Sequence, residues 1–363
     1  MDWLSLYRKI VPWARRRIAR KALFAFNTNY DYVREVSQGK LPRLPKELAA
    51  QLRESMRTGR QREIRIGART ALVLGALGGW RRQIGGQAGN CATAAKALGV
   101  EVLLHRPSRA LPPHYVFEFV RSPAEMDRLI ATYDPQNSEM RADARFVANA
   151  TKRIRSFSHA LVSGFHLLDV HLARNRITGV AELLMKWKRL NPRLWIHTEF
   201  GEFQSLRVLE LVLTHILPLV DSVGMNGQEA LAAGRALGVR GDRYAVCERL
   251  SRITGEVVLH ENSWSFALSK LRPADELRRS LVFANLLAAH RIKTGKRANF
   301  DELARYAGGR LFLCSDGVVE LGKFEERKFG MHAAFAPALI EKAKSTVGVG
   351  DTFAAGYFLT ARK

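Results

Sequence analysis

Cysteine is scarce in this chain, which has only three cysteines among 363 residues: Cys91, Cys247 and Cys314. Their wide separation matches neither a disulfide framework nor the spacing of a cysteine metal site. We therefore expect free, buried thiols in a reducing compartment, which predicts a cytoplasmic protein.

Long apolar runs are missing as well. No stretch reaches the roughly 18 apolar residues that a membrane-spanning helix needs, so we expect no membrane span. Residues 1–21 mix apolar and basic side chains and lack the continuous apolar centre of a signal peptide. This pattern predicts an amphipathic helix that either packs on the main domain or binds a membrane surface or a partner.

Negative charge is the third shortage. The chain has 34 acidic residues against 58 Lys and Arg, which gives a formal net charge of +24. Such a charge favours anionic partners, including nucleotides, sugar phosphates and nucleic acid. We weigh against nucleic acid because the basic residues are spread along the chain and form no recognisable nucleic-acid module.

Short apolar runs alternate with amphipathic helical stretches, which is typical of an α/β fold with a mainly parallel sheet. The expected strands are 22–27, 160–163, 194–198, 222–225, 257–260 and 311–314. The expected helices are 91–98, 177–190, 206–219, 228–237, 274–294 and 352–361. We expect a large nucleotide-binding α/β domain (1–31, 79–99 and 122–363) and a smaller α/β lid domain (32–78 and 100–121).

Residues 345–352, Ser-Thr-Val-Gly-Val-Gly-Asp-Thr, are the most informative segment. Gly348 and Gly350 let the backbone approach a phosphate, and the unpaired N–H groups of the helix that follows point at a bound anion. Asp351 would repel a resting anion, but it has a purpose if it takes the proton of an attacking hydroxyl. The segment predicts phosphoryl transfer, with backbone N–H groups of Gly348, Val349 and Gly350 stabilising the moving phosphate. A capped loop without a catalytic role is the alternative.

Polar side chains also follow the first expected strand. Asn29 and Asp31 are spaced by two, so they can project from one side of an extended chain and serve a polyol. Residues 84–90, Ile-Gly-Gly-Gln-Ala-Gly-Asn, form a glycine-rich turn into a helix, which permits close approach of a ligand. A polar turn and glycine packing are the alternatives. The expected substrate-binding residues are Asn29, Asp31, Gly85, Gly86, Gln87 and Asn90.

Two further motifs narrow the interpretation. Residues 197–199 form a His-x-Glu after an expected strand, and residues 226–229 form an Asn-x-x-Glu that opens a helix. With the Gly-Gly-Gln-Ala-Gly segment before them and Gly-x-Gly-Asp after them, the chain resembles the ADP-dependent glucokinase and phosphofructokinase family of archaeal type, in the ribokinase-like superfamily. The resemblance runs from about residue 27 to 358, although members of this family are usually longer.

The resemblance implies a ribokinase-like large domain and transfer of the β-phosphoryl group of ADP to glucose, fructose 6-phosphate or a related acceptor, releasing AMP. It implies that Asp351 is the base and that Glu199 and Glu229 hold Mg²⁺ through water, in agreement with the preference of Mg²⁺ for oxygen ligands. The implied nucleotide-binding residues are Asn226, Thr346, Gly348 and Gly350. For Glu229, a purely structural role at a helix start is the alternative.

Two other functions stay open at this point. One is an ATP-dependent sugar or nucleoside kinase on the same fold. The other is an inactive, basic nucleic-acid-binding protein, which gains nothing from acidic residues that repel phosphate. The sequence fixes neither the acceptor nor the oligomeric state.

Overall fold

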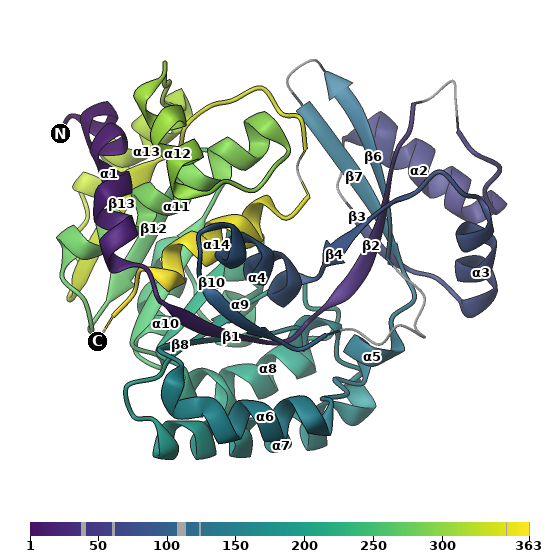
Figure 1. Cartoon of the computed structure of the whole chain (residues 1–363), viewed down its shortest axis with the longest axis horizontal. Coiled ribbons are helices and arrows are strands. Elements are labelled where there is room, and N and C mark those ends of the chain that lie inside the picture. Colours follow the sequence, from purple (N-terminus) through teal and green to yellow (C-terminus); the bar gives the residue numbers. More distant parts are fainter. Residues whose placement is uncertain (38–40, 60–61, 107–113, 123–124, 346, 363) are drawn as a thin grey trace.

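The computed structural model describes residues 1–37, 41–59, 62–106, 114–122, 125–345 and 347–362. These residues are arranged around two β-sheets (Figure 1). A large sheet lies between two layers of helices, and a small sheet stands beside it. Both chain ends lie on the side of the large sheet that is far from the small one.

The large sheet has the order β13-β12-β11-β10-β9-β8-β1-β5. Strands β5, β1, β8, β9, β10 and β11 run parallel, and β12 and β13 add an antiparallel edge. The predicted mainly parallel sheet is therefore confirmed. The strands are β1 Lys21–Phe26, β5 Glu101–Leu104, β8 His159–Ser163, β9 Trp195–Glu199, β10 Ser222–Met225, β11 Glu256–His260, β12 Trp264–Ser269 and β13 His332–Pro337.

The central strands are buried on both faces, which explains their nearly unbroken apolar sequences. Leu23 and Ala25 of β1 pack into one hydrophobic core, whereas Ala22 and Phe24 pack into the other. The first core is covered by α6 Ala144–Arg153, α7 Val170–Leu190, α8 Leu206–His215, α9 Gly227–Ala236 and α10 Arg243–Ser251. The second is covered by α1 Trp3–Arg17, α4 Gln87–Ala97, α11 Ala274–Thr294, α12 Phe300–Gly308 and α14 Val349–Leu359.

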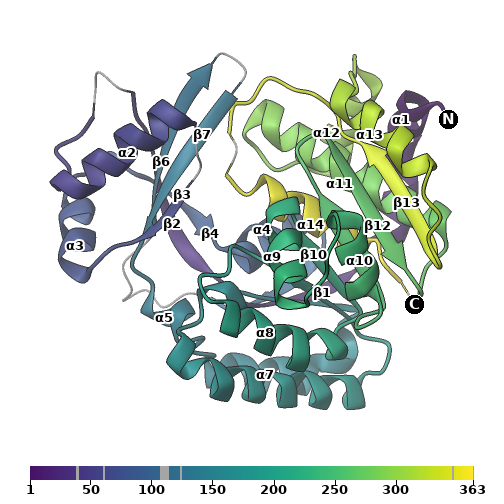
Figure 2. The same cartoon turned by 180° about the vertical axis from the view of Figure 1, so that it is seen from behind.

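The small sheet has the order β3-β7-β6-β2-β4. Its elements are β2 Asn29–Glu35, α2 Lys46–Thr58, β3 Arg62–Arg65, α3 Ala68–Ala76, β4 Arg81–Gly85, β6 His114–Ser122 and β7 Glu125–Thr132. Figure 2 shows α2 and α3 on the face that points away from the large sheet. On the opposite face, Val33 and Val116 contact Val347 in the loop before α14. The short helix α5 Pro135–Ser138 follows β7.

The strand pairing moves several predicted boundaries. β4 and β7 were assigned to the large domain, but they pair with β2 and β6 in the small sheet. β5 was assigned to the lid, but it pairs with β1. β4 and β5 are short and pair with strands far away in the sequence, so local patterns do not determine their sheet. β7 forms a hairpin with β6, which the predicted boundary at residue 122 divides. We propose that the two domains be divided according to this pairing.

The predicted strand 311–314 is wrong. Only an isolated bridge joins Leu313 to Leu339 there, and α13 Ser315–Glu325 begins directly afterwards. A short apolar run has the same sequence signature whether it forms a strand or a buried connection.

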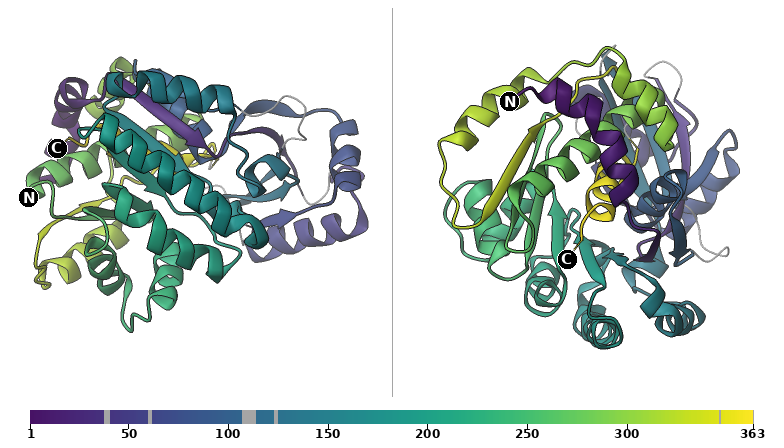
Figure 3. Two further views of the ribbon diagram at one scale, coloured as in Figure 1. Left: turned by 90° about the horizontal axis from the view of Figure 1, so that it is seen from below. Right: turned by 60° about the vertical axis from the view of Figure 1, so that its left-hand side comes forward.

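The N-terminal helix α1 packs on the main body, across α11 and α12 (Figure 3). Its buried side chains recur at helical spacing, and the hydroxyl of Tyr7 donates to the carbonyl oxygen of Pro337 at 2.6 Å. Among the described residues, no helix combines the length and apolar character needed to cross a bilayer. The three cysteines are free, as predicted, with Cys314 only half-buried.

Candidate active site

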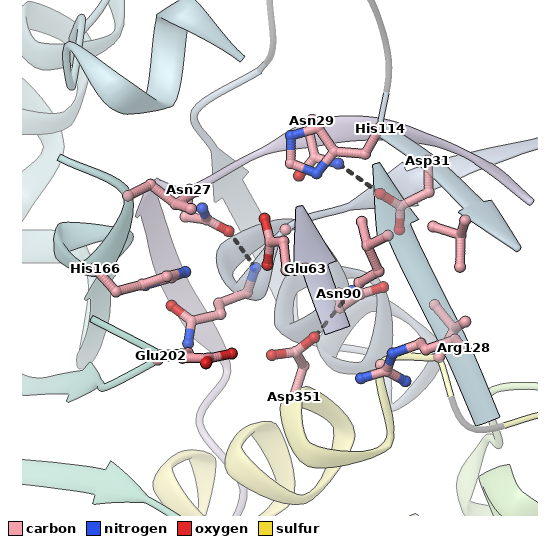
Figure 4. A pocket seen from close by; sticks show the side chains of 18 of the residues that line it. Asn27, Asn29, Asp31, Glu63, Asn90, His114, Arg128, His166, Glu202 and Asp351 are labelled. Carbon is pink, nitrogen blue, oxygen red and sulfur yellow. Dashed lines mark hydrogen bonds between the residues drawn. The ribbon is translucent and has the colours of Figure 1, made fainter. Parts of the chain in front are cut away.

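A cavity of about 290 Å³ lies between the carboxyl edge of the large sheet and the small sheet. Figure 4 shows Asp351 rising into it from α14, with Asn90 of α4 and Arg128 of β7 beside it. The predicted residues that line the cavity are Asn29, Asp31, Gly86, Gln87, Asn90, Asn226, Glu229, Gly348 and Asp351. Those that do not line it are Gly85, Glu199, Val349 and Gly350. Thr346 lies outside the described residues.

Asp351 sits in the first turn of α14. Gly348 precedes this helix with φ 67°, a left-handed conformation that favours glycine. The Asp351 carboxylate accepts a hydrogen bond from Asn90 Nδ2 at 2.9 Å. Burial raises the pKa of Asp351 to about 7 despite that bond, and the negative charge of Glu199 adds to the rise. A carboxyl group with a pKa near neutrality suits a general base.

The glycine-rich turn before α4 is shaped by close approach. A Cβ on Gly86, whose φ is 73°, would lie 2.5 Å from the carbonyl oxygen of Asn27, so only glycine fits. The side-chain oxygen of Asn27 accepts from the backbone N–H of Gln87 at 2.5 Å. The end of β1 therefore fixes the start of α4 against the cavity.

Asn29 and Asp31 share the wall formed by β2. Asn29 Nδ2 donates to Asp31 Oδ1 at 2.5 Å, and burial raises the pKa of Asp31. Gly85 pairs with Asn29 in the neighbouring strand, and a Cβ there would lie 2.1 Å from the carboxyl carbon of Asp31. Gly85 therefore leaves space for the Asp31 side chain and does not itself line the cavity.

Glu199 is buried at the end of β9. Its Oε1 accepts from His197 Nε2 at 2.6 Å, and its Oε2 lies 3.7 Å from His260 Nε2. Burial opposes ionisation of Glu199, but the two histidines outweigh it and lower the pKa to about 2. A Cβ on Gly224 would lie 1.9 Å from Glu199 Oε1, so that glycine leaves space for the carboxylate.

Glu229 and Asn226 form a capping box at the start of α9. Glu229 Oε2 accepts from the Asn226 backbone N–H at 3.0 Å, and Asn226 Oδ1 accepts from the Glu229 backbone N–H at 3.0 Å. The structural role considered for Glu229 is therefore real. Burial also raises the pKa of Glu229 to about 7, and Glu199 and Glu202 add negative charge nearby. The hydrogen bond of the capping box lowers the pKa of Glu229, but it does not outweigh burial.

Sequence reasoning missed several charged residues of the small sheet, among them Glu63 of β3, His114 of β6 and Arg128 of β7. His114 Nε2 lies 2.6 Å from Asp134 Oδ2 at the start of α5, and burial raises the pKa of Glu63. His166 and Glu202, in loops at the carboxyl edge of the large sheet, were missed as well. Arg128 follows Asp127 and precedes the apolar residues 129–131, so the local sequence does not mark it as a site residue.

Residues 114–360 match the family described as the ADP-specific phosphofructokinase/glucokinase conserved region. The chain belongs to this family. The resemblance seen in the sequence is therefore confirmed.

Two relatives illustrate the likeness. The chain is 28% identical over 285 residues to an ADP-dependent glucose/glucosamine kinase of Pyrococcus abyssi, a match covering 68% of this chain and 60% of that protein. It is 28% identical over 244 residues to an ADP-specific phosphofructokinase of Methanosarcina acetivorans, covering 55% of this chain and 49% of that protein. The matches thus span only about half to three-fifths of the relatives' lengths.

Solved structures agree on the fold. An ADP-dependent kinase in complex with fructose 6-phosphate and ADPβS superposes with a TM-score of 0.83 at 19% identity, covering 99% of this chain and 98% of that one. The last common ancestor of ADP-dependent phosphofructokinases from Methanosarcinales gives 0.81 at 18% identity, with both chains fully covered. The predicted α/β fold is confirmed.

Proposed function

We propose that this protein transfers the β-phosphoryl group of ADP to a hydroxyl group of a sugar or sugar phosphate. One observation carries the proposal: Asp351, with its pKa raised to about 7, faces the same cavity as the hydroxyl-binding side chains Asn29 and Asp31. Membership of a family of ADP-specific kinases supports ADP as the donor.

In the proposed reaction, the acceptor hydroxyl oxygen attacks the β-phosphorus while its proton passes to Asp351. The bond between the β-phosphorus and the oxygen that bridges to the α-phosphate breaks, and AMP leaves with the electron pair on that oxygen. The first N–H groups of a helix have no partner within it, so those of Val349 and Gly350 can stabilise the transferring phosphoryl group with that of Gly348.

Mg²⁺ fits the donor set of this site. Within the described part of the chain, no cluster of three or more His, Cys, Asp or Glu forms a ready-made metal site. Yet the buried carboxylate of Glu229 has a pKa raised to about 7 next to further negative charge, which a hydrated divalent cation would relieve. Glu199 is already held by two histidines, so we assign it a supporting position and Glu229 the closer one. When bound, Mg²⁺ would neutralise charge on the diphosphate.

The small sheet closes one side of the cavity, and we propose that it acts as a lid that excludes water from the transfer step. Arg62 and Arg128 place cationic groups in the lining and suit an acceptor that carries a phosphate. Glu63 and Asp31 offer acceptors for sugar hydroxyls. Glucose and fructose 6-phosphate therefore both belong among the substrates to be tested. The free cysteines fit a cytoplasmic location, which stays a prediction.

The test is a panel of sugars and sugar phosphates incubated with Mg²⁺ and ADP, ATP or pyrophosphate. We expect AMP to form with ADP and at least one acceptor. Product formation with ATP alone would replace this proposal by the ATP-dependent kinase. Absence of transfer from every donor, with tight and steeply salt-dependent binding to nucleic acid, would favour the nucleic-acid-binding alternative.

A further inference from the structure

Arg297, in the loop between α11 and α12, belongs to none of the motifs described so far. Its Nη2 donates to Asn90 Oδ1 at 2.8 Å. Asn90 Nδ2 in turn donates to Asp351 Oδ2 at 2.9 Å. Three side chains from three separate parts of the sequence thus form one continuous hydrogen-bonded chain that ends on the proposed base.

These two hydrogen bonds determine which way the Asn90 amide faces. A guanidinium group can only donate and an ionised carboxylate can only accept, so Asn90 must turn its oxygen to Arg297 and its nitrogen to Asp351. Asn90 is buried and fits tightly, since a Cβ on Gly348 would lie 2.9 Å from its amide carbon. Without Arg297, the orientation of the amide would depend on Asp351 alone, and a protonated Asp351 could donate to the amide oxygen instead.

Arg297 differs from Arg291, a buried arginine nearby. Arg291 uses its donors on the backbone, with Nε and Nη2 directed at the carbonyl oxygen of Val347 and Nη1 at that of Gly295. Arg297 Nε is buried without a hydrogen-bond partner, and Arg297 forms no ion pair with a described carboxylate. Its charge acts instead on two cavity carboxylates at longer range, Asp351 and Asp31.

We propose that Arg297 is a positioning residue for Asp351, orienting its carboxylate through Asn90 and favouring its ionised form. The catalytic meaning of this role rests on the proposed function. The contacts themselves do not, because they hold together side chains of the free protein.

Other ionisable groups also influence the pKa of Asp351, and they limit how far that pKa should change when Arg297 is replaced. Those facing it from the surrounding elements are Glu199 of β9, Asp31 of β2, Arg128 of β7, Cys91 of α4 and His260 of β11. Arg128 stays in place when Arg297 is removed, so a partial and measurable shift is expected.

The direct test is carbon-13 NMR of the free protein labelled at aspartate carboxyl groups, with the Asp351 signal assigned by its loss in Asp351→Asn. In Arg297→Met we expect the Asp351 titration midpoint to rise by about one pH unit, the size expected for one partly screened charge. Arg297→Lys keeps the charge and should shift it by less than half as much. Lys296→Met, an exposed charge in the same loop, is the matched control and should shift nothing. Equal midpoints in the wild type and Arg297→Met would overturn the proposal.

The pH profile of kcat/KM is the second readout. Its acidic limb should move to higher pH in Arg297→Met, with about a fivefold loss of kcat/KM at pH 7 that recovers partly at higher pH. In an Asn90→Ala background the same substitution should cost less than threefold. A pH-independent loss, additive with Asn90→Ala, would show a purely structural role. If the NMR shift occurs but no acceptor is phosphorylated, the positioning role stands and the proposed function fails.

Discussion

The two edges of the large sheet carry opposite charge. At the carboxyl edge, the carboxylates of Glu199, Glu229 and Asp351 are buried around the candidate active site. At the amino edge of β1, β8 and β9, a cavity of about 520 Å³ is lined by Arg20, Lys21, Arg193 and Arg362, together with smaller and aromatic side chains. The two ends of these strands therefore differ in the sign of their local charge, while Arg62 and Arg128 bring positive charge to the cleft only from the small sheet.

The fold itself explains part of this difference. Helices that connect parallel strands run opposite to them, so their positive N-termini gather at the carboxyl edge and their negative C-termini at the amino edge. Glu229 and Asp351 lie in first turns of helices, and α7 ends with Lys188 and Arg189. The dipoles do not explain why Glu199, Glu229 and Asp351, which carry like charges, are buried close together at the carboxyl edge. His159 at the amino edge stays neutral, since burial lowers its pKa to about 4.

The largest expected effect is that of Asp351→Asn, which removes the proton acceptor at the carboxyl edge. Turnover should fall at least ~10²-fold while ADP affinity changes little, because general base catalysis contributes about that much. Single-turnover AMP formation and calorimetric ADP binding measure the two quantities. Near-normal turnover would show that Asp351 is not the proton acceptor. The carboxyl edge would then no longer differ from the amino edge by carrying a catalytic carboxylate.

Glu229→Gln sharpens the comparison by removing one of the buried charges. Glutamine can keep the capping box, so α9 should stay folded. The Mg²⁺ concentration needed for half-maximal activity should rise about tenfold, in line with the effect of residues that support a metal site. A magnesium titration unchanged from wild type would place the metal elsewhere.

The pH dependence tests whether burial really raises proton affinity at this edge. Burial raises the pKa of Asp351 to about 7 in the folded protein, well above the ordinary value of an aspartate. Since only the ionised form accepts a proton, kcat/KM should fall up to about tenfold per pH unit below pH 7. Because the folded state holds that proton to higher pH than the unfolded chain, Asp351 makes the free protein less stable as the pH rises from about 4 to 7. Denaturant unfolding of wild type and Asp351→Asn should therefore diverge over that range, and parallel curves would contradict the assignment.

The smallest effect is expected at the amino edge. Arg193→Gln and Arg362→Gln alter exposed charges without buried partners, so turnover should change less than about twofold and the free energy of unfolding by about 0.5 kcal/mol or less. Steady-state assays and denaturant titrations provide both numbers. A tenfold loss of turnover would show that the two edges are coupled.

The sequence predicted one edge of the large sheet far better than the small sheet. Asn29, Asn90 and Asp351 could be placed together because each follows or opens an element at the carboxyl edge, where parallel sheets bind ligands. Glu63 and Arg128 could not, because their strands meet by long-range pairing such as Arg62 with Leu129. Arg297 escaped notice since its loop carries no motif, and only coordinates reveal its contact with Asn90.

The loop before α14 is held partly by the small sheet, with Val347 against Val33 and Val116 and the Ser345 hydroxyl donating to Glu118 at 3.1 Å. If that sheet swings outward to admit substrate, the loop loses these supports at the same moment. The open state that admits substrate would then lack an ordered loop before α14. In that state the protein would not transfer the phosphoryl group of ADP to water.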